Sequence, residues 1–219
     1  MVTFNNVSFS YGKKEILKNL SFSVGSGECL VLAGPNGSGK STAASMVAGV
    51  LQPKSGEISV RGSVGFVPQG TALFEDMSVA DNLRFFAGLK NCHVPERLPF
   101  GVERYRKMRV SRLSGGMKKQ VSIACALLGD PEIVLMDEPC ASLDVCYRAE
   151  LAELITRLKN RGCAVIYVGH EPMEFASFYD RLLFFQDGYI EHTREQLSGN
   201  PAEDIRLCEQ FAELFITQK

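Results

Sequence analysis

Residues 28–41 read ECLVLAGPNGSGKS, and this stretch decides the fold. The run from Cys29 to Ala33 is apolar throughout, as expected of a strand that is covered on both faces of a parallel sheet. A glycine-rich loop follows directly and leads into a helical segment near 40–49. A strand, a GxxxxGK[ST] loop and a helix in this order form a phosphate-binding unit. The stretch therefore predicts an α/β core that binds a nucleotide.

The loop at 34–41, GPNGSGKS, contains the residue types that phosphate binding requires. Glycine lets the backbone wrap closely enough for its N–H groups to face the phosphates. Lys40 brings a positive charge to the β- and γ-phosphates, and the Ser41 hydroxyl is a ligand for Mg²⁺. A glycine turn without a ligand is the alternative, and the strand–loop–helix context disfavours it. We expect nucleotide contacts from Gly34, Pro35, Asn36, Gly37, Ser38, Gly39, Lys40, Ser41 and Thr42.

Composition narrows the class of protein. The chain has 219 residues, 45% of them hydrophobic, which is enough for one sizeable core. Its 24 basic residues against 25 acidic ones leave no basic excess, so no nucleic-acid partner is expected. No apolar run approaches the ~18 residues of a membrane span, and the N-terminus lacks a signal-peptide pattern. Seven cysteines without a CxxC pair indicate reduced thiols rather than disulfides or zinc. We expect a soluble intracellular chain.

Hydrophobic periodicity predicts the remaining elements. Alternation over the first 24 residues indicates two antiparallel strands, and a second strand pair is expected around 57–67. The pattern is mostly helical from about 79 to 128, and buried strands at 133–136 and 163–169 flank a helix at 145–162. A hairpin at Asp187-Gly188 precedes a last helix. That helix begins at Asn200-Pro201 and carries Ile205, Cys208, Phe211 and Phe215.

These elements predict one α/β domain over residues 1–219 with a RecA-like parallel-sheet core of the P-loop NTPase type. An antiparallel β lobe is expected at about 1–26 and 56–68. A helical lobe is expected at about 72–128, inserted into the core that the remaining residues form.

Two carboxylates follow the buried strand IVLM, namely Asp137 and Glu138. The carboxyl ends of parallel strands are where α/β proteins bind ligands. Asp137 is predicted to hold Mg²⁺ through water, and Glu138 to take the proton of the attacking water. A pair of solvated carboxylates is the alternative, and the phosphate loop favours the catalytic interpretation.

A second glycine cradle, LSGGM at 113–117, precedes the helical run KKQVSIACALL. Helix-start amides and the helix dipole both favour an anion there. One nucleotide does not need two such cradles, so this stretch requires a separate explanation.

Seven elements in one order, spread over nearly the whole chain, resemble the ATP-binding cassette (ABC) family. They are Tyr11 in SFSYG, GPNGSGKS, Gln69 in GFVPQG, LSGGM, IVLMDEP, SLD at 142–144 and His170 in VGHE. No guanine-reading NKxD motif is present. A small-molecule kinase with a P-loop would not explain LSGG, Gln69 and His170 together.

The resemblance assigns a role to each remaining motif. Tyr11 would stack on adenine, Gln69 would contact Mg²⁺ and the attacking water and signal to a membrane subunit, and His170 would donate to the γ-phosphate. Asp144 would act across a dimer interface. Without the resemblance, Tyr11 would be interpreted as ordinary packing, Gln69 as a loop residue and His170 as a structural histidine. His93 and His192 are left as structural histidines.

The family's signature turn reaches ATP only when a second cassette packs head to tail. Ser114, Gly115 and Gly116 would therefore contact the ATP of a partner chain. ATP would hold two chains together, and hydrolysis would let them open. LSGGM thus predicts half of a site that a second molecule completes.

Some positions depart from the commonest family pattern. Met117 replaces glutamine, and with SGGMKK and ALLGDPEIVLMDEP it resembles the ABC-2-type exporter branch. Cys140, Ser142 and Gly169 replace Thr, Gly and Thr, and the stretch between Asn82-Leu83 and the signature is short, so a shortened helical lobe is expected. The basic run RYRKMR at 104–109 is interpreted as a solvated helix face or a surface near lipid headgroups.

The sequence therefore predicts an Mg²⁺-dependent ATPase subunit that drives transport, with export favoured. Its expected partners are an integral membrane subunit and a second ABC ATPase chain, with a homodimer favoured over a heterodimer. Its expected location is the cytoplasmic face of the plasma (inner) membrane. The alternative is a soluble ABC ATPase of translation or DNA repair. The cargo belongs to the membrane subunit and is not encoded here.

Overall fold

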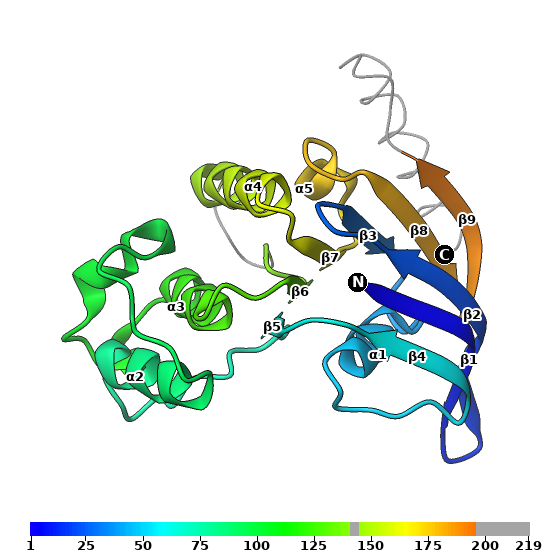
Figure 1. Ribbon diagram of the computed structural model, residues 1–219, viewed down its shortest axis with the longest axis horizontal. Coiled ribbons are helices and arrows are strands. Elements are labelled where there is room, and N and C mark those ends of the chain that lie inside the picture. Colours follow the sequence, from blue (N-terminus) through cyan, green and yellow to red (C-terminus); the bar gives the residue numbers. More distant parts are fainter. Residues whose placement is uncertain (141–144, 196–219) are drawn as a thin grey trace.

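The computed structural model describes residues 1–140 and 145–195 (Figure 1). The predicted SLD motif with Asp144 and the predicted last helix lie outside the described residues. Two sheets organise the described part. A three-stranded sheet has the order β2-β1-β4, and a six-stranded sheet has the order β5-β6-β7-β3-β8-β9.

The six-stranded sheet is the α/β core. Its strands are β5 (Val64–Val67), β6 (Ile133–Asp137), β7 (Ala164–Val168), β3 (Cys29–Ala33), β8 (Arg181–Gln186) and β9 (Tyr189–Glu195). The first five pair in parallel, and β9 is added antiparallel through the predicted hairpin. Asp187 (φ 48°) and Gly188 (φ 85°) both have positive φ, as a two-residue type I′ turn requires.

Both faces of this sheet are covered, which explains why its strands read as unbroken apolar runs. In β3, Val31 packs into one hydrophobic cluster with α4 (Val145–Asn160) and α5 (Pro172–Phe175). Its neighbour Leu32 packs into a second cluster with α1 (Lys40–Val47) and the antiparallel sheet. Figure 1 shows α4 and α5 on one side of the core and α1 on the other.

The antiparallel sheet consists of β1 (Val2–Tyr11), β2 (Lys14–Val24) and β4 (Ser55–Val60). The expected pairing of two strands within 57–67 is wrong. β4 pairs with β1, whereas β5 pairs with β6 in the core sheet. The chain changes sheets at residues 61–63, where the Arg61 N–H donates to the Met1 carbonyl and the Ser63 carbonyl accepts from the Ile133 N–H.

The helical region that connects β5 to β6 has its own core. It contains α2 (Val79–Leu89), α3 (Gly115–Leu127) and the short 3₁₀ segments η1 (Pro99–Tyr105) and η2 (Val110–Arg112), as the helical pattern predicted. Ser78 caps α2, and Ser114 caps α3 by accepting from the Met117 N–H at 3.3 Å. That this lobe is shortened relative to the family stays a prediction.

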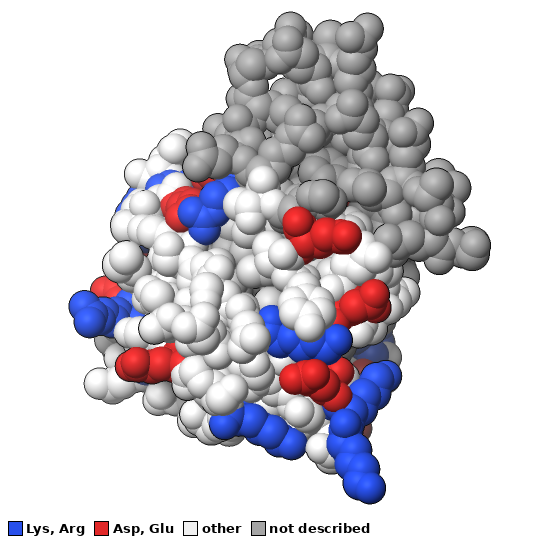
Figure 2. Space-filling model, turned by 90° about the vertical axis from the view of Figure 1, so that its right-hand side faces the viewer, with Lys and Arg blue, Asp and Glu red and all other residues white. Residues whose placement is uncertain are grey.

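Within the described ranges, none of the helices is both long and apolar enough to cross a bilayer. Cys29, Cys92, Cys125, Cys140 and Cys163 are free thiols. Figure 2 shows basic and acidic side chains interspersed on the face of the molecule that lies at the right of Figure 1.

Candidate nucleotide-binding and hydrolysis site

Two glycines fix the shape of the phosphate loop between β3 and α1. Gly34 has φ 140°, and a Cβ there would lie 2.1 Å from the Phe185 carbonyl oxygen. Gly39 has φ 107°, and a Cβ there would lie 2.5 Å from a methyl of Leu17. Both conformations are ones that side chains disfavour, so the loop requires glycine at these positions.

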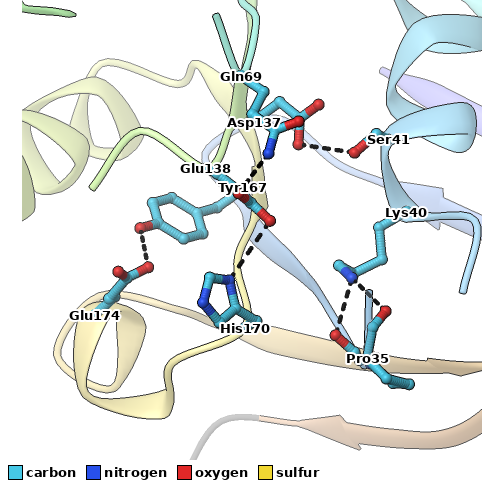
Figure 3. Close-up of polar contacts among 10 residues, drawn as sticks. Pro35, Lys40, Ser41, Gln69, Asp137, Glu138, Tyr167, His170 and Glu174 are labelled. Carbon is cyan, nitrogen blue, oxygen red and sulfur yellow. Dashed lines mark hydrogen bonds and ion pairs between the residues drawn. The ribbon is translucent and has the colours of Figure 1, made fainter. Parts of the chain in front are cut away.

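Lys40 lies at the mouth of this loop and is only 4% exposed. Its Nζ donates to the Gly34 carbonyl at 2.9 Å and to the Pro35 carbonyl at 2.8 Å (Figure 3). Burial lowers the pKa of Lys40, while the charges of Glu138 and Asp137 raise it. The loop thus closes around the Lys40 ammonium, and Lys40 also lines the adjoining cleft.

Ser41 and Asp137 meet beside the loop. The Ser41 hydroxyl donates to Asp137 Oδ1 at 3.2 Å. Asp137 is 5% exposed, and burial raises the pKa of its carboxyl, while the bond from Ser41 opposes that shift. A hydroxyl and a carboxylate side by side are hard oxygen ligands of the kind Mg²⁺ prefers, so the donor set fits that ion.

Glu138 lies between Gln69 and His170 (Figure 3). Gln69 Nε2 donates to Glu138 Oε2 at 2.9 Å, and His170 Nδ1 lies 3.5 Å from Glu138 Oε1. The Glu138 backbone has φ 48°, and its N–H donates to the Val168 carbonyl at 3.0 Å. This left-handed backbone turns the Glu138 side chain away from the strand direction, while Asp137 still belongs to β6.

A cleft of about 340 Å³ opens beside these groups. Tyr11 lines it with 54% of the residue exposed, and its ring makes a T-shaped contact with Phe9 with 4.9 Å between centroids. An exposed ring beside a phosphate loop is suited to stack on a base. The cleft is lined by Tyr11, Lys14, Ile16, Asn36, Gly37, Gly39, Lys40, Ser41, Thr42, Gln69 and Glu138.

The signature turn does not line this cleft. Ser114 and Gly115 are exposed at the start of α3, and a Cβ on Gly115 would meet nothing within 4 Å. Figure 1 shows α3 in the helical lobe, apart from α1 and its loop. Ser114 and Gly115 are thus open to solvent, where an anion from outside the chain could reach them.

Sequence reasoning missed three parts of this region. Lys14 and Ile16 line the cleft from β2, and the pairing of Tyr11 with Lys14 across the β1–β2 turn could have placed Lys14 there. A buried hydrogen bond joins Tyr167 of β7 to Glu174 of α5: the Tyr167 hydroxyl donates to Glu174 Oε2 at 3.0 Å. Lys119, two residues beyond the signature, binds the loop that carries Gln69.

A family model described as "ABC transporter" matches residues 17–141. The linearmycin resistance ATP-binding protein LnrL of Bacillus subtilis is 34% identical over 86% of this chain and 67% of its own length. The Nod factor export ATP-binding protein I of Mesorhizobium japonicum is 39% identical over 85% of this chain and 61% of its own. The chain thus spans about two thirds of the length of these relatives.

Solved structures agree with the fold. One described as an ATP-binding subunit of an ABC transporter superposes with a TM-score of 0.82 at 24% identity, over 95% of this chain and 99% of that chain. A dimeric ATP-binding cassette with ADP and Pi superposes with a TM-score of 0.76 at 24% identity, over 90% and 100%. The phosphate loop, the carboxylate pair and the family model together define a P-loop ATPase. The chain belongs to the ABC transporter family, as its ATP-binding ATPase domain.

Proposed function

We propose that this ATPase domain drives export by pairing head to tail with a second cassette, each chain completing the other's ATP site. The observation that carries the proposal is the exposure of Ser114 and Gly115 at the start of α3, outside the chain's own cleft. A phosphate-binding turn facing solvent needs a ligand that another molecule brings. A homodimer supplies two identical sites from one sequence.

The proposed mechanism uses groups that the cleft already brings together. Ser41, Asp137 through water, and Gln69 would hold Mg²⁺, which when bound neutralises phosphate charge. A water attacks the γ-phosphorus and passes its proton to Glu138, the bond between that phosphorus and the bridging oxygen breaks, and ADP and phosphate result. Lys40 and His170 donate hydrogen bonds to the γ-phosphate oxygens.

Gln69 is proposed to control the availability of Glu138. Its amide occupies the same carboxylate that must accept a proton from water, at 2.9 Å. Turnover therefore requires Gln69 to shift from Glu138 towards the water and the ion. A shift of about 1 Å in such a group can change a rate a hundredfold.

Several observations support an exporter with a membrane partner. Met117 matches the pattern of the ABC-2-type branch, and the relatives include proteins named for Nod factor export and for linearmycin resistance. These names do not favour a translation or DNA-repair ATPase. We propose that the chain works at the cytoplasmic face of a membrane, bound to an integral membrane subunit.

An exposed aromatic pair in the helical lobe is proposed to bind that subunit. Phe74 is 45% exposed and Phe85 is 41% exposed, with ring centroids 4.8 Å apart. Exposed aromatic side chains are common anchors of protein interfaces. Phe74 lies five residues after Gln69, so a bound partner would act close to the catalytic cleft.

Replacement of both rings, Phe74→Ser with Phe85→Ser, is expected to reduce co-purification with the membrane subunit roughly tenfold or more. Both rings are partly solvated, so the isolated chain should fold and keep its ATP affinity. Tyr189→Ser removes an equally exposed ring (50%) from β9 and serves as the matched control. Co-purification of the double variant at the control level would remove this surface from the proposal.

Tyr11→Ala is expected to weaken ATP binding by roughly tenfold, because base stacking on an aromatic ring contributes about 1–3 kcal/mol. The phosphate loop is unchanged, so inorganic triphosphate should bind the variant and the parent equally. Titration calorimetry with both ligands measures the two affinities. Equal loss for triphosphate and ATP would place Tyr11 in the loop's structure rather than at the base.

A further inference from the structure

A buried lysine joins the signature helix to the loop that carries Gln69. Lys119 of α3 is 5% exposed. Its Nζ donates to three consecutive backbone carbonyls, those of Pro68 at 2.9 Å, Gln69 at 2.8 Å and Gly70 at 3.4 Å. An ammonium carries three N–H donors and no acceptor, so this side chain can serve all three carbonyls.

The neighbouring lysine on the same helix behaves differently. Lys118 pairs with Glu75 at 2.6 Å in an exposed ion pair. Burial lowers the pKa of Lys119, whereas the charges of Asp137 and Glu138 raise it. Burying an ammonium is costly unless it is well hydrogen-bonded. The three carbonyls are what makes a charged group acceptable at this depth.

Lys119 also lies on the same rigid element as the signature. Lys119 lies five positions after Ser114, the N-cap of α3, which corresponds to about 7.5 Å of helix rise. At the other end of the contact, the Gln69 side chain donates to Glu138. A continuous series of contacts therefore runs from the exposed signature through Lys119 and the Gln69 backbone to the Glu138 carboxylate.

We propose that Lys119 is a positioning residue that ties Gln69 to the signature helix, so that a displacement of α3 moves Gln69 relative to Glu138. Engagement of Ser114 by the ATP of a partner chain would then move Gln69 in the chain that carries this helix. The inference rests on the role proposed above for Gln69. It gives the phosphate bound at the signature a route to the catalytic carboxylate of the chain that bears the signature.

A double-mutant cycle of steady-state ATPase activity tests the inference. Lys119→Met keeps the length of the side chain and removes all three donors, and is expected to lower kcat roughly tenfold or more. Gln69→Ala is expected to lower kcat by a similar factor. Because Lys119 acts through Gln69, Lys119→Met should cost less than about twofold in the Gln69→Ala background. ATP affinity of the Lys119→Met chain should stay within about twofold of the parent, since Lys119 does not line the cleft and the phosphate loop is untouched.

The matched control is Lys90→Met. Lys90 Nζ likewise donates to backbone carbonyls, those of Cys125 and Ala126 in the last turn of α3 and of its C-cap Leu128, at the other end of that helix from Lys119. Its replacement removes a comparable structural contact, so any loss of kcat should be the same with Gln69 present or absent. Thermal unfolding of each variant checks the fold.

The possible outcomes separate the two proposals. Loss of the Lys119→Met effect in the Gln69→Ala background supports the positioning role. A Lys119→Met effect of equal size in both backgrounds, as for Lys90→Met, overturns it and leaves the role of Gln69 intact. An unchanged kcat for Gln69→Ala alone overturns the role of Gln69 itself. If Lys119→Met does not fold, Lys119→Gln, which keeps two uncharged N–H donors, enters the same cycle with the same criterion.

Discussion

Glu138→Gln is expected to reduce ATP turnover by about 10²–10⁴-fold while leaving ATP binding intact. The amide keeps the size of the side chain and can still accept a hydrogen bond from Gln69, which lies 2.9 Å away. It cannot take a proton from water, so the ATP-bound state should accumulate. Phosphate release and the ATP dissociation constant are the two quantities to measure.

Glu171→Gln is the matched control for this prediction. Glu171 lies next to His170 in sequence, is half exposed, and pairs with Arg148 at 3.1 Å. The control should lose little activity, because an exposed ion pair contributes little and Glu171 does not line the cleft. A Glu138→Gln chain that hydrolyses ATP at a near-normal rate would remove Glu138 from the role of general base.

Ser114→Arg is expected to abolish ATPase activity without weakening ATP binding to the isolated chain. Ser114 is exposed, and within the part of the chain that the structure describes its side chain caps α3. Loss of a cap costs about 1 kcal/mol, which the fold should tolerate. A bulky side chain at this point should block the approach of a second cassette and its nucleotide. The ATPase rate and the ATP affinity of the isolated Ser114→Arg chain are the two quantities to measure.

Ser177→Arg places the same side chain at an exposed serine elsewhere on the core and should keep normal activity. Weakened ATP binding in the isolated Ser114→Arg chain would contradict the account, because Ser114 would then serve the chain's own site. Normal ATPase activity in that variant would equally contradict a shared site.

Much of the candidate site could be predicted from the sequence, because it follows one rule of parallel sheets. The strands lie in the order β5-β6-β7-β3, so their carboxyl ends meet at one edge of the sheet. Gln69 follows β5, Glu138 follows β6, His170 follows β7 and Gly34 follows β3. Apolar runs that end in polar residues are visible in a sequence, and the sheet brings those ends together.

The pairing of β4 and β5 and the contacts of Lys119 could not be predicted, because they depend on long-range contacts that hydrophobic periodicity does not encode. The alternation over 57–67 marked two strands correctly but could not say that β4 pairs with β1 and β5 with β6. The role of Lys119 depends on backbone carbonyls about fifty residues away, and a carbonyl carries no sequence signal. Lys118 and Lys119 look alike in the sequence, yet one lies in an exposed ion pair and the other is buried.

The central claim is that two chains share each ATP, and the mass of the particle in solution tests it most directly. The measurement compares the Glu138→Gln chain with the Glu138→Gln/Ser114→Arg chain by light scattering, each with and without saturating ATP. The account predicts twice the 24.1 kDa chain mass for the first chain with ATP and the single-chain mass for the second, although both bind ATP. A first chain that stays monomeric with ATP bound, or a second chain that still dimerises, would contradict it.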